Sequence, residues 1–134
     1  MTATGPDSLR LELLVPERVR TGERVVIRLG LQNVGPRSVD LYLRGRTPTF
    51  DVVVARTTGD VIWRRLEGEI ILAIVHLRPL APGERLEAEV VWDQRSNAGE
   101  PVGAGRYRVQ GLLLVEGEPR RTPSTSLRIA GADE

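Results

Sequence analysis

Histidine, serine and paired carboxylates are the side chains through which this sequence could carry out acid–base or nucleophilic chemistry. The single histidine, His76, lies in an apolar segment without a local acidic partner, and no serine lies in the Gly-x-Ser-x-Gly context of a nucleophile elbow. We therefore expect His76 to be a strand-end residue that is partly exposed or bonded to the backbone. The pairs 67/69 and 87/89 are glutamates two residues apart. On a strand each pair shares one face, and outside a cleft we expect it to be solvated instead of serving as acid and base.

Metal and cofactor chemistry find no support in the residue types. The chain has no cysteine and one histidine, so it cannot build a tetrahedral zinc centre. No acidic loop has the spacing of a calcium-binding EF-hand, and no glycine-rich loop precedes a helix to hold a nucleotide. We expect no catalytic residue, no metal and no cofactor, and hence a protein that is not an enzyme.

The charges argue against nucleic acid and membrane partners. The chain has nineteen basic residues, all arginine, and eighteen acidic ones, and positive and negative charges alternate along most segments. A nucleic-acid binder usually concentrates its basic residues, so the arginine bias is better explained by a GC-rich bacterial genome. No apolar run approaches the length of a membrane span, and residues 1–8 lack the pattern of a signal peptide. These features predict a cytoplasmic protein; the alternative is an exported protein whose leader is missing ahead of Met1.

Alternating apolar and polar residues must supply the elements that position any site. The segment from Val25 to Leu31 is the clearest example, and similar segments recur about every ten residues between turns rich in glycine and proline. No segment has helical periodicity of useful length. The pattern predicts an all-β, immunoglobulin-like antiparallel sandwich of eight to nine strands. We expect it to span residues 8–130, after a flexible N-terminal arm (1–7) and before a C-terminal tail (131–134).

Two segments stand out as candidate binding surfaces. The run from Ile70 to Val75 is apolar on both faces, which indicates either a central strand covered on both sides, the preferred interpretation, or an exposed edge strand that invites pairing. The polar segment from Asp93 to Gly103 is the longest loop, and it contains an Arg95–Ser96 bond that a protease could recognise. Its glycines predict a flexible loop with a high ordering cost on binding.

Several motifs follow one another in an order that resembles the BsuPI family of intracellular proteinase inhibitors. They are Phe-Asp-Val-Val-Val at 50–54, Gly-Asp-Val-Ile-Trp-Arg at 59–64, Leu-Ala-Pro-Gly-Glu at 80–84, and Gly-Arg-Tyr-Arg-Val at 105–109. An opening strand at 25–33 that ends in asparagine precedes them. The residues that carry the resemblance, and that we expect to specify the fold, are Phe50, Asp51, Trp63, Arg64, Trp92 and Tyr107. We expect the four aromatic side chains to fill the sandwich.

The resemblance implies a protein partner and an inhibitory function. A BsuPI-type protein would act on a subtilisin-like serine protease, as a monomer or weak homodimer, and the expected contact residues are Arg95, Ser96, Asn97 and Glu100. The sequence departs from the family at 65–66, where Arg-Leu replaces Trp-Ser, and at 70–74, where an aliphatic run replaces an aromatic-rich one. The alternative is therefore a general protein-interaction or assembly module of the same fold without inhibitory activity.

Overall fold

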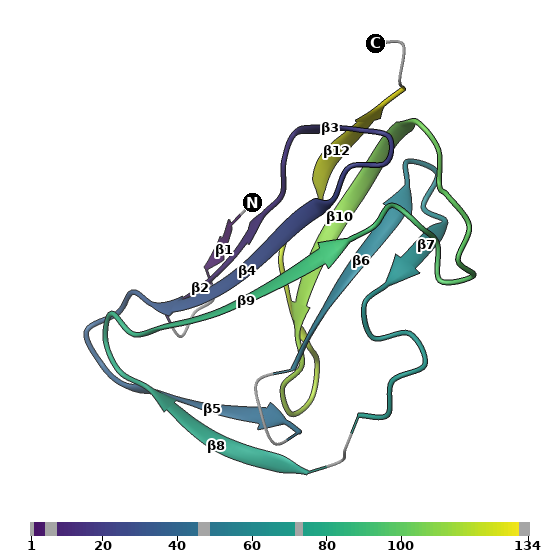
Figure 1. Cartoon of the computed structure of the whole chain (residues 1–134). Helices are drawn as coiled ribbons and strands as arrows, with labels where there is room; N and C mark the ends of the chain where they lie inside the picture. Colours follow the sequence, from purple (N-terminus) through teal and green to yellow (C-terminus); the bar gives the residue numbers. More distant parts are fainter. Residues whose placement is uncertain (1, 5–7, 46–48, 72–73, 132–134) are drawn as a thin grey trace.

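Strands joined by turns make up the part of the chain that the computed structural model describes, which is residues 2–4, 8–45, 49–71 and 74–131 (Figure 1). Nine strands of four or more residues match the eight to nine that the sequence predicts, and three shorter ones accompany them. In chain order they are β1 (Thr2–Thr4), β2 (Leu9–Leu14), β3 (Arg18–Arg20), β4 (Val25–Asn33), β5 (Val39–Arg44), β6 (Phe50–Arg56), β7 (Val61–Arg64), β8 (Val75–Leu80), β9 (Arg85–Trp92), β10 (Gly105–Leu113), β11 (Arg120–Arg121) and β12 (Thr125–Ala130).

Two sheets form the sandwich. The first has the strand order β1-β2-β4-β9, and the second has the order β3-β12-β10-β6-β7, with β11 paired to β10. All neighbours are antiparallel except β12 and β3. The all-β, immunoglobulin-like sandwich expected from the sequence is therefore confirmed. Within the predicted N-terminal arm, Thr2–Thr4 pair with β2. The domain boundaries and the C-terminal tail stay predictions.

A third, two-stranded sheet of β5 and β8 extends from one end of the sandwich (Figure 1). It is attached through the other edge of β5, where the N–H of Arg44 donates to the Leu114 carbonyl at 3.3 Å. The N–H of Glu116 donates to the Tyr42 carbonyl at 2.9 Å. The outer edge of β8 has no strand beside it among the described residues.

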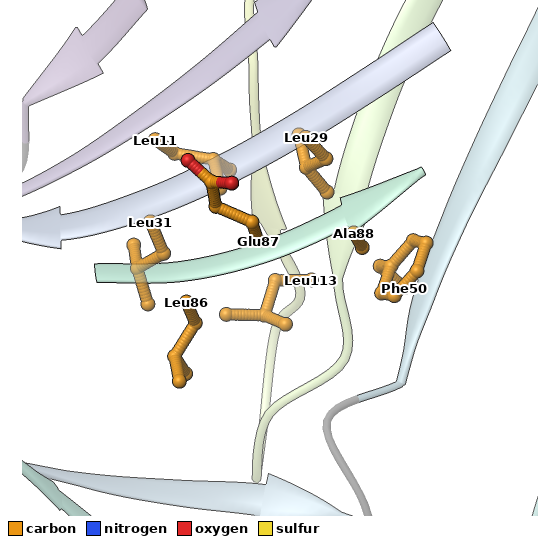
Figure 2. A pocket seen from close by; sticks show the side chains of 8 residues that line it. All are labelled: Leu11, Leu29, Leu31, Phe50, Leu86, Glu87, Ala88 and Leu113. Atoms are coloured by element: carbon orange, nitrogen blue, oxygen red, sulfur yellow. The ribbon is translucent and has the colours of Figure 1, made fainter. Parts of the chain in front are cut away.

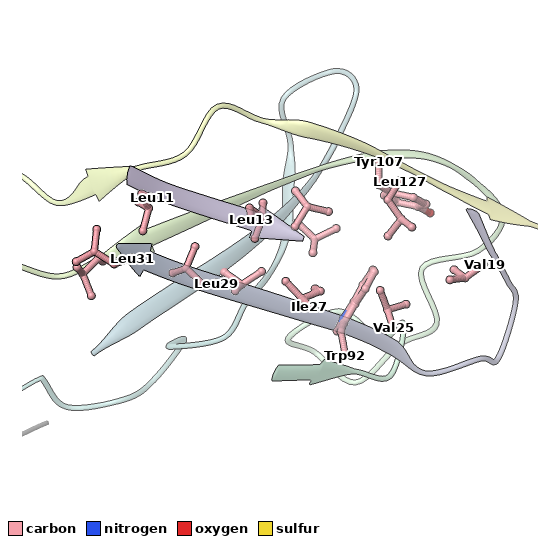
Figure 3. Packing of buried hydrophobic residues seen from close by; sticks show 14 of the residues in the cluster. Leu11, Leu13, Val19, Val25, Ile27, Leu29, Leu31, Trp92, Tyr107 and Leu127 are labelled. Atoms are coloured by element: carbon pink, nitrogen blue, oxygen red, sulfur yellow. The ribbon is translucent and has the colours of Figure 1, made fainter. Parts of the chain in front are cut away.

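The core lies between the two main sheets, and the alternating strands supply it (Figure 3). Inward-facing side chains of β2 and β4 meet those of β6, β10 and β12, as the period-two pattern predicts. Burying each leucine, isoleucine or valine contributes about 1.5–3 kcal/mol. The inward row of β10 is interrupted at Gly111, where an added Cβ would lie 2.7 Å from Cδ1 of Leu29 and 3.3 Å from Cδ1 of Leu13. Glycine there leaves the space into which these two leucines pack.

Asn33 is the fully buried polar residue that joins the ends of the first and third sheets. Its amide group donates to the carbonyls of Arg37 (2.7 Å) and Leu80 (2.9 Å), and its carbonyl oxygen accepts from the N–H of Gly35 (3.0 Å). Every hydrogen-bonding atom of this side chain therefore has a partner, as a buried amide requires.

Candidate functional site

The loop from Asp93 to Gly103 folds back on itself as a small hairpin. Arg95 bridges to Pro101, the N–H of Ser96 donates to the Glu100 carbonyl at 2.8 Å, and the N–H of Gly99 donates to the Ser96 carbonyl at 2.9 Å. The Ser96 hydroxyl oxygen accepts from the N–H of Ala98 at 3.2 Å. Within the tip, which comprises Ser96 to Glu100, residues 97–100 are exposed.

Gln94 fixes the base of this hairpin. Its side chain is 5% exposed, and its Nε2 donates to the carbonyls of Arg20 (2.7 Å) and Glu23 (2.9 Å) in the β3–β4 turn. Its backbone carbonyl accepts from the N–H of Val102 at 3.0 Å. Trp92 holds the same region, because its indole N–H donates to the Arg95 carbonyl at 2.9 Å. Gln94 is a functional residue that the sequence did not predict, since a lone glutamine in a polar loop gives no signal of burial.

Two further residues hold the loop from its sides. The hydroxyl of Tyr107 lies 2.6 Å from the Val102 carbonyl oxygen and 2.8 Å from that of Gly103. At the tip, Asn97 hydrogen-bonds to backbone groups at the edge of β7, as a neighbouring strand would. Its Oδ1 accepts from the Arg64 N–H at 2.7 Å, its Nδ2 donates to the Arg64 carbonyl at 3.0 Å, and its own N–H donates to the Ile62 carbonyl at 3.2 Å.

The expectation of a flexible loop is therefore wrong. Gly99 (φ 85°) and Gly103 (φ 83°) have the left-handed backbone that the tight turns require, and hydrogen bonds hold the loop at its base, side and tip. The Arg95–Ser96 bond lies inside the closed hairpin, where the Arg95 carbonyl and the Ser96 N–H are both hydrogen-bonded. The side chain of Arg95 also stays local, since its Nη1 donates to the Gly99 carbonyl at 2.9 Å.

The six motif residues lie on or beside β6, β7, β9 and β10. Trp92 and Tyr107 are buried, as expected of aromatic core residues. Phe50 and Trp63 are half-buried and pack against the core. The ring centroids of Trp63 and Trp92 lie 5.7 Å apart. Asp51 acts on the backbone, because its Oδ1 accepts from the N–H of Val52 (2.8 Å) and of Leu66 (3.1 Å). Arg64 contributes the backbone groups that Asn97 binds.

The apolar run at 70–75 does not form the central strand, covered on both sides, that the sequence favours. Ile70 and Ile71 lie outside any strand, residues 72–73 lie outside the described residues, and Val75 begins β8, which is an edge strand. Ile70 is 88% exposed. A short run of apolar residues does not by itself distinguish a buried strand from an exposed segment.

Pro79 shortens the usable edge of β8. Pro79 has no N–H, and the Arg78 side chain donates to its carbonyl at 2.5 Å. Proline at a sheet edge prevents another strand from pairing there. His76, on the same strand, is half-buried, and its Nδ1–H donates to the Gly45 carbonyl at 2.6 Å, as the expectation of a backbone-bonded histidine requires.

The glutamates considered as acid–base pairs are surface residues. Glu87 and Glu89 project from the outer face of β9 and pair with Arg85 (2.5 Å) and Arg28 (3.0 Å). The hydrogen bond to Glu87 raises the pKa of Arg85. Glu67 and Glu69 lie exposed in a turn after β7. Among the described residues, no cluster of three or more acidic or histidine side chains could hold a metal ion.

The turn that joins β8 to β9 carries Glu84, a carboxylate whose pKa is lowered by its hydrogen bonds. Arg78 Nη2 donates to Glu84 Oε2 at 2.7 Å, and the N–H of Ala81 donates to Glu84 Oε1 at 2.9 Å. The Arg78 hydrogen bond, followed by the Ala81 N–H, lowers the pKa of Glu84. This arrangement orients the start of β9.

Arginines that are distant in sequence gather on the outer face of the second sheet. Arg128 lies opposite Arg18 on one side and Arg106 on the other, and Arg108 follows two residues along β10. The sequence showed alternating charges instead of a basic stripe, because strand pairing determines this arrangement. The expectation that the chain binds no nucleic acid stays a prediction.

The sequence profile of the BsuPI family, whose description is intracellular proteinase inhibitor, matches residues 14–118. The chain belongs to the BsuPI family. The match covers the hairpin and all six motif residues, so the resemblance expected from the motifs is confirmed. The family is one of inhibitors, which are not enzymes. No curated protein sequence matches the chain. In the part of the chain that the structure describes, no helix has the length and apolar character to cross a membrane.

Solved structures of other proteins share the fold of this BsuPI-family chain. Dimeric latent PorU from Porphyromonas gingivalis matches with a TM-score of 0.53 and 19% identity, over 95% of this chain and 10% of PorU. The alkylpurine DNA glycosylase AlkC from Pseudomonas fluorescens matches with a TM-score of 0.50 and 18% identity, over 94% of this chain and 31% of AlkC. The CARDB domain of PF1109 from Pyrococcus furiosus matches with a TM-score of 0.49 and 16% identity, over 96% of this chain and 93% of that domain. The chain thus spans a minor part of PorU and AlkC, and at these identities the likeness to those two proteins shows the fold alone.

Proposed function

We propose that this chain inhibits a subtilisin-like serine protease in the cytoplasm by placing the hairpin tip, Ser96 to Glu100, against the active-site cleft of the enzyme. Membership of an intracellular proteinase inhibitor family supports the class of function. The observation that carries the choice of surface is the hydrogen bonding of Asn97 to the edge of β7, which holds an exposed tip in one conformation. A loop held in this way loses little conformational entropy when it binds.

The surface around the tip is large enough to extend the contact. A shallow hollow lies between β7 and the hairpin, and Val61, Ile62 and Arg64 line it on one side with Asn97 and Ala98 on the other. Protease–inhibitor complexes bury about 800 Å² on each partner. Five tip residues cannot supply that area alone, so we place the β7 strand in the same interface.

The hydrogen bonds of the hairpin also oppose cleavage of the inhibitor by its target protease. A protease cleaves a segment that opens into its active site, whereas the Arg95 carbonyl and the Ser96 N–H are held by Trp92 and Glu100. We expect the Arg95–Ser96 bond to be cleaved slowly in the intact fold. Inhibition would then come from blocking the cleft and not from turnover of this bond.

The test is an inhibition assay of a subtilisin-like serine protease with a chromogenic peptide substrate and the full chain. Replacing Ala98→Arg and Glu100→Arg together should weaken inhibition about tenfold or more, as expected for central interface residues. The matched control is Arg106→Ala on the outer face of the second sheet, which should inhibit like the original chain. Cleavage at Arg95 without inhibition, or equal inhibition by the tip variant, would remove the proposal.

A further inference from the structure

The strand β9 has one edge that no other part of the described structure covers. It pairs with β4 along its whole length, from Gln32 opposite Arg85 to Val25 opposite Trp92. Figure 1 shows it at the border of the first sheet, with β2 and β1 on the far side of β4. Among the described residues, no backbone hydrogen bond joins residues 86–91 to any segment except β4.

Hydrogen bonds at the end of β4 indicate which groups of β9 face outward. The N–H of Asn33 donates to the Glu84 carbonyl on the β9 side, whereas the N–H of Val34 donates to the Ser8 carbonyl on the β2 side. Because successive residues of a strand alternate, the odd-numbered residues of β4 bond to β9. Their partners on β9 are residues 86, 88, 90 and 92. Residues 85, 87, 89 and 91 therefore direct their N–H and C=O groups away from the sheet.

The other long edge strands are protected, and β9 is not. Asn97 covers the edge of β7, and Pro79 removes a donor from the edge of β8. Strand β9 contains no proline and pairs with β4 in an unbroken register. An open edge of this length is a template for another strand.

An apolar cleft lies beside this open edge. Leu86 and Ala88 on the inner face of β9 are half-buried, and with Phe50 of β6 and Leu113 of β10 they line a cavity of about 80 Å³ between the sheets (Figure 2). A strand added next to β9 would direct every second side chain toward this cleft, because side chains alternate across a sheet. The cleft therefore favours apolar residues at alternate positions of the added strand.

We propose that the open edge of β9 binds an extended segment of another protein, with apolar residues at alternate positions and lysine or arginine between them. The outward-facing residues of the added strand would lie beside Glu87 and Glu89, whose side chains are 69% and 53% exposed. Opposite charges on neighbouring strands stabilise pairing, and like charges oppose it. Each carboxylate already pairs with one arginine of this chain, Arg85 or Arg28, but more than half of each side chain stays exposed. Basic residues therefore fit these positions.

The same charges disfavour a second copy of this chain in the register that uses the whole edge. Two β9 strands related by a two-fold axis, paired through all four outward-facing residues, would place Glu87 opposite Glu89 of the other copy, twice. Shifting the register by two residues loses one pair and places Glu87 opposite itself, but it also places Arg85 opposite Glu89 of the other copy, twice. The carboxylates thus oppose self-pairing along the full edge, and a basic partner is the occupant that satisfies both of them in that register.

The experiment uses the full chain and two labelled decapeptides, one alternating lysine with valine and the other alternating glutamate with valine. Fluorescence anisotropy measures binding, and hydrogen exchange followed by NMR measures amide protection. The Lys/Val peptide should bind better and protect the amides of Glu87, Glu89 and Val91 about tenfold or more. The amides of Leu86 and Ala88 already bond to β4, so they should not change.

Two variants test the edge and its charge separately. Val91→Pro removes one outward N–H without breaking a bond to β4 and keeps both carboxylates, and it should weaken Lys/Val binding about tenfold. Glu87→Lys with Glu89→Lys replaces exposed side chains, removes their ion pairs with Arg85 and Arg28, and should reverse the preference toward the Glu/Val peptide.

Several outcomes would overturn the proposal. They are the absence of Lys/Val binding, equal binding of both peptides, unchanged binding by both variants, and protection that does not alternate along β9. A dimer whose β9 amides become protected as protein concentration rises, without peptide, would assign the edge to a second copy instead. The proposal does not depend on the hairpin. Peptide binding without protease inhibition would favour the general interaction module over the inhibitor.

Discussion

Replacing Asn97 by alanine should release the tip of the hairpin while the sandwich stays folded. The substitution removes the Asn97 side-chain hydrogen bonds of 2.7 Å and 3.0 Å to Arg64. Each neutral hydrogen bond contributes about 0.5–1.5 kcal/mol, and both of these are exposed, so we expect a loss of about 1–2 kcal/mol. The backbone bond from Asn97 to Ile62 and the buried Gln94 remain, so the base of the loop should hold.

Hydrogen exchange measures this loss locally. A change of 1–2 kcal/mol corresponds to about a 5- to 30-fold faster exchange of the Arg64 amide, while amides at the centre of β10 should exchange as before. Asn97→Asp is the matched control. It keeps the acceptor for the Arg64 N–H but loses the donor to the Arg64 carbonyl, so exchange should be intermediate. In the protease assay Asn97→Ala should weaken inhibition by a similar factor, since the free loop must then be ordered on binding.

Two results would refute this reasoning. One is an Arg64 amide that exchanges at the same rate in Asn97→Ala as in the original chain. The other is faster exchange of all amides by a common factor, which would mean that Asn97 stabilises the whole fold and does not hold the tip in particular.

Four further substitutions test the contacts that hold the fold and the site, and urea denaturation measures the first three. Tyr107→Phe removes the hydroxyl that bonds two loop carbonyls and should cost about 1–3 kcal/mol. Asn33→Ala deprives three backbone groups of a partner and should cost about 2–4 kcal/mol, more than Tyr107→Phe. Gly111→Ala places a methyl group 2.7 Å from a leucine carbon and should cost about 1–3 kcal/mol by overpacking. Glu84 has a folded pKa below its ordinary value of 4.5, so its charge stabilises the fold above that pH, and the stabilisation is lost as the pH falls through the folded pKa. Glu84→Gln should therefore be less stable than the original chain at pH 7 and equally stable at a pH below the folded pKa.

The predicted site shows where local sequence information stops. Arg95, Ser96, Asn97 and Glu100 do lie together in the longest loop, because residues close in sequence and bounded by strands must do so. The rigidity of that loop could not be predicted. It depends on Gln94 reaching the β3–β4 turn and Asn97 reaching β7, and in both cases the partner is about thirty or more residues away. Glycine content indicated turns, but turns held by such contacts are not flexible.

The sequence by itself determined the strands, the turns, the inward rows of aliphatic side chains and the family. These follow from local rules, since alternation with a period of two fixes which side chains can face a core. Only the tertiary structure decided which strands lie at the edges and what covers them. Strand order brings Asn97 to β7 and leaves β9 open, and it gathers arginines from β3, β10 and β12 on one face. Edge exposure and charge clustering are properties of the order in which strands pair, and pairing joins residues far apart in the chain.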